Sequence, residues 1–97
     1  MLVPAYDICV PQVSNVIGQG HPFIVAAGNE SQDANNVSPA RVPEAITVGA
    51  TTINDTFASF SNFGPAVDIL APGLDILSAG FQAANATAIL SGTSMAT

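Results

Sequence analysis

The sequence predicts an incomplete α/β domain, in which strands of a parallel sheet have a flanking helix and a β-hairpin follows near the C-terminus. Three continuous apolar runs of strand length carry this prediction, because strands buried on both faces are typical of parallel sheets. The runs cover residues 23–27, 45–51 and 67–71. The segments between them, 28–44 and 52–66, show no helical pattern, and connections of that length are uncommon inside a self-sufficient domain. The chain is therefore interpreted as a part of a larger folded unit.

The composition supports this interpretation and excludes several kinds of partner. The 97 residues are 48% hydrophobic but only 8% charged, against roughly 25% charged in an ordinary soluble domain. The chain has seven acidic residues and a single Lys or Arg residue, Arg41, which gives a net charge of −6. Nucleic acid is not an expected partner, because phosphate binding needs clustered Lys and Arg. A membrane is not expected either, since no apolar run approaches the ~18 residues of a spanning segment.

The first eleven residues show the weakest pattern. Pro4 and Pro11 enclose residues 6–10, which fit either a short strand or a turn. No basic segment precedes an apolar run there, so no signal peptide is expected in residues 1–10. Cys9 is the only cysteine, which excludes an intrachain disulfide and a cysteine-based metal site.

A short helix and the first strand come next. Val13, Val16 and Ile17 recur at helical spacing, and a Gly-Gln-Gly stop follows them, which predicts a helix over residues 13–18. The apolar strand over residues 23–27 then ends at a Gly-Asn pair.

The C-terminal half contains the other strands and a terminal helix. Strands are predicted over residues 45–51 and 67–71, and a Pro-Gly turn signal ends the second of these. Residues 75–79 and 87–90 predict a β-hairpin around a short connection. In residues 92–97, small flexible residues lead into helix formers, which predicts a loop that passes into a helix.

Four short motifs occur in order between about Val16 and Thr97. They are Ala-Ala-Gly-Asn at 26–29, Ser-Phe-Ser-Asn-Phe-Gly at 59–64, Asp-Ile-Leu-Ala-Pro-Gly at 68–73 and Gly-Thr-Ser-Met-Ala-Thr at 92–97. In order and spacing they resemble the subtilisin-like serine proteases (subtilases), and most of all the secreted fungal enzymes of the proteinase K type. The resemblance implies a partial subtilisin-like fold, with residues 14–97 as part of a catalytic domain and residues 1–13 as a diverged or mispredicted N-terminal segment.

The resemblance assigns two catalytic roles. Ser94 aligns with the nucleophile, which attacks the scissile carbonyl and forms an acyl-enzyme. Asn29 aligns with the side-chain amide that donates a hydrogen bond to the oxyanion, alongside the backbone N–H of Ser94. Two simpler interpretations stay open, namely Ser94 as an ordinary helix N-cap and Asn29 as a turn residue.

A substrate pocket follows from the same resemblance. Ala26, Ala27 and Gly28 align with one wall of the primary specificity pocket, and Val37 lies near its base. Small residues at these positions imply a roomy apolar pocket. The expected substrate is therefore a peptide or protein with a large apolar P1 side chain.

The resemblance further implies a structural Ca²⁺ site. Asp68 aligns with a calcium carboxylate, and the other protein ligands are backbone carbonyls that correspond to Pro43 and Ala45. A carboxylate with carbonyl oxygens suits a hard cation. A solvated or capping acid is an equally good interpretation of a single carboxylate, so both stay open. No organic cofactor is expected.

The base that activates a serine nucleophile has no counterpart in the sequence. The Asp and His motifs that lie upstream of the oxyanion asparagine in the family are absent, and the only histidine, His21, precedes the strand over residues 23–27. That strand is about 16 Å long at ~3.3 Å per residue, which places His21 at the opposite end of the sheet from Asn29 and Ser94. The resemblance therefore implies a serine endopeptidase fragment that is inactive alone.

The expected partner is the missing N-terminal half of the domain, and the parent enzyme is expected to be secreted. Four Asn-x-Ser/Thr triplets support secretion only weakly, because such triplets arise often by chance. The alternative is a non-catalytic product of a truncated gene that acts as a binding or decoy fragment.

Overall fold

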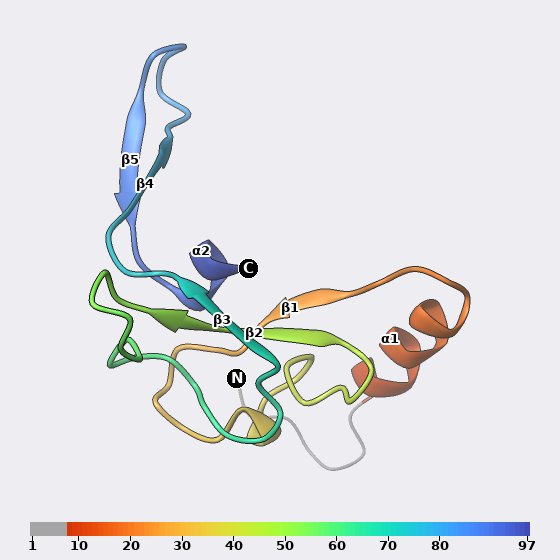
Figure 1. The fold of residues 1–97 in the computed structure, drawn as a ribbon. Coiled ribbons are helices and arrows are strands. Elements are labelled where there is room, and N and C mark those ends of the chain that lie inside the picture. The colour runs from red at the N-terminus through yellow and green to blue at the C-terminus, as the bar shows by residue number, and fades with distance from the viewer. Residues whose placement is uncertain (1–7) are drawn as a thin grey trace.

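The computed structural model describes residues 8–97 and confirms the incomplete α/β fold (Figure 1). Three strands form a parallel sheet in the order β1-β2-β3, and β4 and β5 form a separate antiparallel hairpin. In chain order, the elements are α1 (Cys9–Gly18), β1 (Ile24–Ala26), the 3-10 helix η1 (Ala34–Asn36), β2 (Ile46–Thr51), β3 (Ile69–Pro72), β4 (Ile76–Ala79), β5 (Thr87–Leu90) and α2 (Thr93–Ala96).

The first helix begins earlier than predicted. α1 includes Cys9 and Val10, so the strand interpretation of residues 6–10 is wrong for these two residues, and residues 6–7 lie outside the described part of the chain. Pro11 is compatible with the helix because the first turn has no intrahelical acceptor for its missing N–H. α1 therefore crosses the position 13/14 at which a domain boundary was predicted.

Two small apolar clusters form the core on one face of the sheet. Val13 of α1 packs with Val25 of β1 and with Val42 and Ala45, which precede β2. The second cluster comprises Ala27, Ala34, Val37 and Ala40. Most of these side chains are small, which allows the irregular segment between β1 and β2 to pack directly against the strands.

The opposite face of the sheet is covered only in part. Successive strand residues point to opposite faces, and the register pairs Ile24 with Ile46 and Val48 with Ile69. These four side chains therefore share one face. Ile24, Ile46 and Ile69 are 53%, 43% and 57% exposed, whereas α2 contacts β1, β2 and β3. The expected burial of both faces is thus found only near α2.

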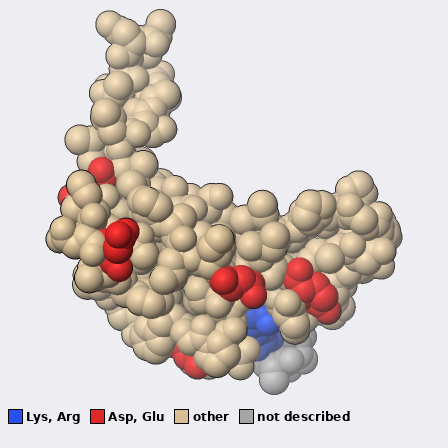
Figure 2. Space-filling model, in the orientation of Figure 1, with Lys and Arg blue, Asp and Glu red and all other residues tan. Residues whose placement is uncertain are grey.

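The hairpin projects away from the sheet beside α2, and α1 lies at the other end of the molecule (Figure 1). Figure 2 shows the acidic side chains spread over the visible face, with one basic side chain among them. Within residues 8–97, no helix has the length and apolarity needed to cross a membrane.

Candidate active site

Ser94 lies in the first turn of α2 with its side chain exposed. The segment that precedes it is held by Gly92, whose backbone N–H donates to the carbonyl oxygen of Gly73 at 2.8 Å. Thr93, the residue directly before Ser94, is fully buried. The serine is therefore presented at the surface on a short helix whose start is anchored to the end of β3.

Thr93 connects this helix to the end of β1. Its backbone N–H and its hydroxyl both donate to Oδ1 of Asn29, at 2.8 and 2.9 Å. The same hydroxyl oxygen accepts a hydrogen bond from the backbone N–H of Gly28 at 3.1 Å. These three bonds bring together residues that are about 65 positions apart in the chain. In the sequence, Thr93 stands out only as one residue of the motif at 92–97, so its role in connecting α2 to the segment after β1 was not predicted.

The hydrogen bonds of Thr93 also determine which way the Asn29 amide faces. Because Oδ1 accepts two donors from Thr93, the Nδ2 group points elsewhere. A methyl group built on Gly92 would lie 3.8 Å from Nδ2 of Asn29 and 3.8 Å from the backbone N of Ser94. Two nitrogens that carry N–H donors therefore border the same small space beside Gly92, as does Sδ of Met95, which lies 3.4 Å from the same point. Such a pair is suited to binding an oxygen that acquires negative charge.

Ser94 also borders an apolar hollow between α2 and the hairpin. The hollow measures about 320 Å³, and six other residues line it together with Ser94: Ile76, Ser78, Ala79, Ala88, Leu90 and Met95.

The residues predicted to form the specificity pocket lie at and after the end of β1. Ala27 is fully buried and packs with Val37 in the second core cluster, while Ala26 and Gly28 are half-buried. Ala27 and Val37 thus belong to the same buried cluster. Their assignment to a pocket wall and base stays a prediction.

Glu30 is a second residue that sequence reasoning missed. Its Oε2 accepts a hydrogen bond from the backbone N–H of Asn29 at 2.7 Å. This bond is the main reason why the pKa of the Glu30 carboxyl lies below its ordinary value; burial acts in the opposite direction, and a weaker bond from the Asn62 amide assists the lowering. The carboxylate form of Glu30 therefore supports the backbone at Asn29.

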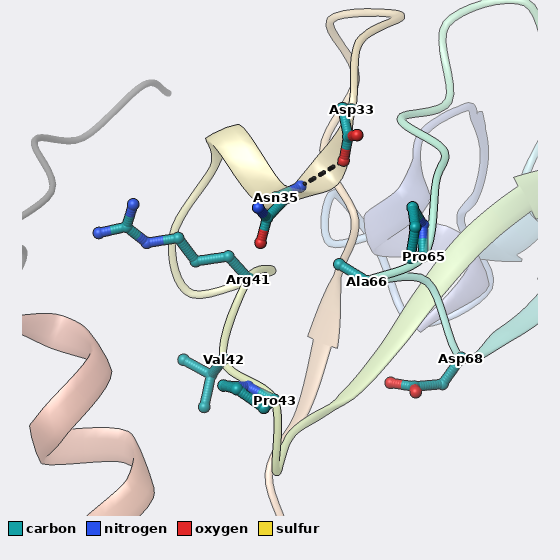
Figure 3. Close-up of a pocket in the computed structure, with 8 residues that line it drawn as sticks. All are labelled: Asp33, Asn35, Arg41, Val42, Pro43, Pro65, Ala66 and Asp68. Carbon is teal, nitrogen blue, oxygen red and sulfur yellow. Dashed lines mark hydrogen bonds between the residues drawn. The ribbon is translucent and has the colours of Figure 1, made fainter.

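Two of the three predicted calcium ligands lie at a different hollow, of about 370 Å³ (Figure 3). Asp68 and Pro43 line it, and the Arg41 side chain extends away from Asp68. Oδ2 of Asp68 accepts a hydrogen bond from the backbone N–H of Thr47 at 2.8 Å, as a capping acid would. Ala45 is buried nearby in the first core cluster. No group of three or more His, Cys, Asp or Glu side chains is suitably placed for a metal ion within residues 8–97.

A cation at this hollow would therefore depend on backbone oxygens. One oxygen of the Asp68 carboxylate already accepts from Thr47, so the other is the oxygen best placed to serve a metal. Carbonyl groups would have to complete the coordination, which Ca²⁺ accepts more readily than softer metals do. The donor set fits a hard cation, and the metal site stays a prediction.

His21 is exposed and precedes β1, whereas Asn29 follows it. The two residues therefore lie beyond opposite ends of the strand, as the sequence predicts. In the part of the chain that the structure describes, no other histidine is present to act as a base for Ser94.

Comparisons with known proteins agree on one family. A family model described as the subtilase family matches residues 6–97. The chain is 57% identical over 93 residues to the subtilisin-like serine protease Rho m 2.0101 of Rhodotorula mucilaginosa, and 56% identical over 93 residues to cerevisin of Saccharomyces cerevisiae. These alignments cover 96% of this chain but only 26% and 14% of the two relatives.

A second pair of comparisons extends to a bacterial relative and to a solved structure. The extracellular serine proteinase of Thermus sp. is 55% identical over 85 residues, which are 88% of this chain and 21% of that protein. The crystal structure of a cold-adapted subtilisin-like serine proteinase superposes with a TM-score of 0.84 at 49% identity, and covers 89% of this chain and 31% of that one. The chain thus spans between about a seventh and a third of these proteins.

Proposed function

Because the chain belongs to the subtilase family, we propose that it carries the nucleophile and the oxyanion-binding half of a serine endopeptidase active site. Ser94 is the proposed nucleophile, and Nδ2 of Asn29 and the backbone N–H of Ser94 are the proposed oxyanion donors. The complete reaction would then require residues of the parent domain that lie outside these 97 positions.

One observation carries the proposal. The Asn29 amide nitrogen and the Ser94 backbone nitrogen border the same space beside Gly92, each 3.8 Å from the position of a methyl group there. The orientation of Asn29 is held by two hydrogen bonds from Thr93. Donors that are fixed before substrate arrives need little reorganisation when charge develops, which is the physical basis of oxyanion stabilisation.

The proposed chemistry is acyl transfer in two steps. Oγ of Ser94 attacks the carbonyl carbon of the substrate, and a general base takes the hydroxyl proton. The negative charge on the carbonyl oxygen is stabilised by the two N–H donors. The amine leaves with the proton from the base, and water then hydrolyses the acyl-enzyme by the same route.

The isolated chain is proposed to be inactive because its only histidine, His21, is not placed near Ser94. A serine hydroxyl is a weak nucleophile until a neighbouring group accepts its proton. His21 lies beyond the far end of β1 and is exposed. The residual catalysis that oxyanion binding alone supports amounts to roughly 10³–10⁴ over water in subtilisin, which is far below the turnover of a protease.

A chimeric enzyme tests the function directly. Residues 8–97 would replace the aligned segment of the Rhodotorula relative, so that the relative provides the histidine and aspartate. We expect the chimera to hydrolyse a fluorogenic peptide with a large apolar P1 residue. Ser94→Ala should abolish turnover, and Asn29→Leu should lower kcat by about 10²- to 10³-fold, as loss of an oxyanion-hole asparagine does in subtilisin.

Two results would contradict the proposal. A chimera that folds but stays inactive would refute the assignment of Ser94 and Asn29. Rapid hydrolysis by the 97-residue chain alone, lost on Ser94→Ala, would refute its proposed inactivity. Ser14→Ala is a suitable control that should retain turnover, because Ser14 lies on α1 whereas Ser94 lies on α2.

The finer features of the proposal concern substrate and location. A large apolar P1 preference is supported by the small side chains at Ala26, Ala27 and Gly28 together with the family membership. Secretion of the parent protein is supported by the Thermus relative, which is named an extracellular proteinase. A P1 series of peptides, assayed with the chimera, would reject the preference if small or charged P1 residues gave the highest kcat/KM.

Calcium binding is a separate part of the proposal, with Asp68 and the carbonyl oxygens of Pro43 and Ala45 as ligands. It is supported by the shared hollow of Asp68 and Pro43. We expect CaCl₂ to raise the Tm of the chimera, and Asp68→Asn to remove most of that rise. An equal calcium response in both proteins would exclude Asp68 as a ligand.

A further inference from the structure

Asn62 lies at the centre of the loops that surround the proposed oxyanion donor. Its side chain is fully buried, although it comes from the irregular segment between β2 and β3. A buried amide carries two N–H donors and a carbonyl oxygen with two lone pairs, and each of these needs a partner. The position of those partners identifies the part of the molecule that Asn62 holds together.

The hydrogen-bonding groups of Asn62 engage the segment that follows β1. Oδ1 accepts from the backbone N–H groups of Glu30 at 3.0 Å and Gln32 at 3.1 Å. Nδ2 donates to the backbone carbonyl of Ala27 at 2.9 Å and to Oε1 of Glu30 at 3.4 Å. The backbone N–H donates to the carbonyl of Gly28 at 2.9 Å. One residue therefore holds the backbone both before and after the proposed oxyanion donor.

The two segments also fit closely in space. Gly28 has a φ of +104°, and a methyl group built on it would overlap Nδ2 of Asn62. Glu30 extends the network, because its Oε2 accepts from the backbone N–H of Asn29. Asn62 thus acts on Asn29 from two sides, through Gly28 and through Glu30.

We propose that Asn62 is a positioning residue for the reaction at Ser94. It holds the backbone on both sides of Asn29, so that Nδ2 of Asn29 stays beside Gly92. Its catalytic consequence rests on the proposed function, whereas its effect on the backbone does not. Asn62 acts through this segment and does not touch the reacting atoms.

Asparagine is the side chain that this role requires. Aspartate has the same shape but would turn two donors into an acceptor that faces the Ala27 carbonyl and the Glu30 carboxylate. Glutamine is one methylene longer and would collide with Gly28, where the available space is already filled. Alanine would leave the backbone N–H groups of Glu30 and Gln32 and the carbonyl oxygen of Ala27 without these partners.

The first test measures catalysis in the chimeric enzyme. We expect Asn62→Asp to lower kcat by about 10- to 100-fold with little change in KM, because a misplaced donor weakens the transition state more than substrate binding. Asn15→Asp is the matched control, since Asn15 is an exposed residue of α1, and it should retain full activity. An unchanged kcat for Asn62→Asp, or a rise in KM that accounts for its whole effect, would overturn the proposal.

The second test needs neither activity nor a substitution at Asn62. In the folded, unmutated chimera, hydrogen exchange by NMR should show slow exchange of the Asn62 side-chain amide and of the Glu30 and Gln32 backbone amides. The side-chain amide of Asn15 should exchange rapidly. Equal exchange at Asn62 and Asn15 would overturn the proposal even if Asn62→Asp fails to fold. Protected amides in an inactive chimera would refute the proposed function but would retain the effect of Asn62 on the backbone beside Asn29.

Discussion

At the scale of single residues, Thr93 decides how the candidate site is assembled. Its hydroxyl accepts from Gly28 and donates to Asn29, so one buried oxygen links the end of β1 to the start of α2. Serine is the nearest substitute for this role, because it keeps the hydroxyl. Valine keeps the shape but removes both hydrogen bonds.

We therefore expect Thr93→Val to destabilise the chimeric enzyme by about 1–3 kcal/mol, because the Gly28 N–H loses its acceptor in a partly buried position. It should also lower kcat, since Asn29 keeps only the backbone donor of Thr93. Urea unfolding followed by circular dichroism measures the first effect, and the peptide assay measures the second. Thr93→Ser is the control, and a loss in Thr93→Ser as large as in Thr93→Val would contradict the role of the hydroxyl.

At the scale of elements, the contact between the end of β3 and the start of α2 leaves no room for a side chain. A methyl group on Gly73 would lie 2.7 Å from Cβ of Ala50 and 2.7 Å from the carbonyl oxygen of Gly92. The Gly92 N–H also donates to the Gly73 carbonyl. The segment that carries Ser94 is thus placed by close backbone packing against the sheet.

Gly73→Ala is expected to destabilise the chimera by about 1–3 kcal/mol, because the overpacked methyl must push β3 and α2 apart. Gly18→Ala at the end of α1 is the matched control. A methyl there meets nothing within 4 Å, and alanine favours a helix over glycine. Thermal unfolding of the two variants makes the comparison, and equal Tm values would show that the Gly73 contact relaxes without cost.

At the scale of the whole molecule, the described chain leaves two apolar surfaces open. One is the sheet face with Ile24, Ile46 and Ile69. The other is on the hairpin, where Leu77 and Ile89 lie opposite each other and are 66% and 64% exposed. Exposed apolar faces and free strand edges favour association or incomplete folding.

The 97-residue chain alone is therefore expected to fold poorly and to self-associate. Size-exclusion chromatography with light scattering, together with a thermal scan, tests this expectation. Ile24→Lys with Ile46→Lys should reduce association, whereas Ile53→Lys should not, because Ile53 is 95% exposed on a loop outside both surfaces. A monomer with a cooperative thermal transition would contradict the prediction.

The pattern of apolar residues along the chain predicts most of the helices and strands. The apolar runs predicted the three parallel strands, and two short strand patterns around a short connection predicted the hairpin, with errors of at most two residues at the strand ends. The helical spacing predicted α1 but placed its start four residues late, at Val13 instead of Cys9. The proline at position 11 obscured that start, because proline is compatible with the first turn of a helix as well as with a break.

By itself, the sequence determined the family, the order of the strands along the chain and the identity of the candidate nucleophile and oxyanion donor. These follow from motifs and local periodicity, which depend only on residues that are close together in the chain. Only the tertiary structure decided how Asn29 faces Ser94, and that Thr93, Glu30 and Asn62 hold it there. The physical reason is that the hydrogen bonds from Thr93 to Asn29 and from the Glu30 backbone to Asn62 join segments 64 and 32 positions apart in the chain, so folding alone brings their donors within 3.0 Å of their acceptors.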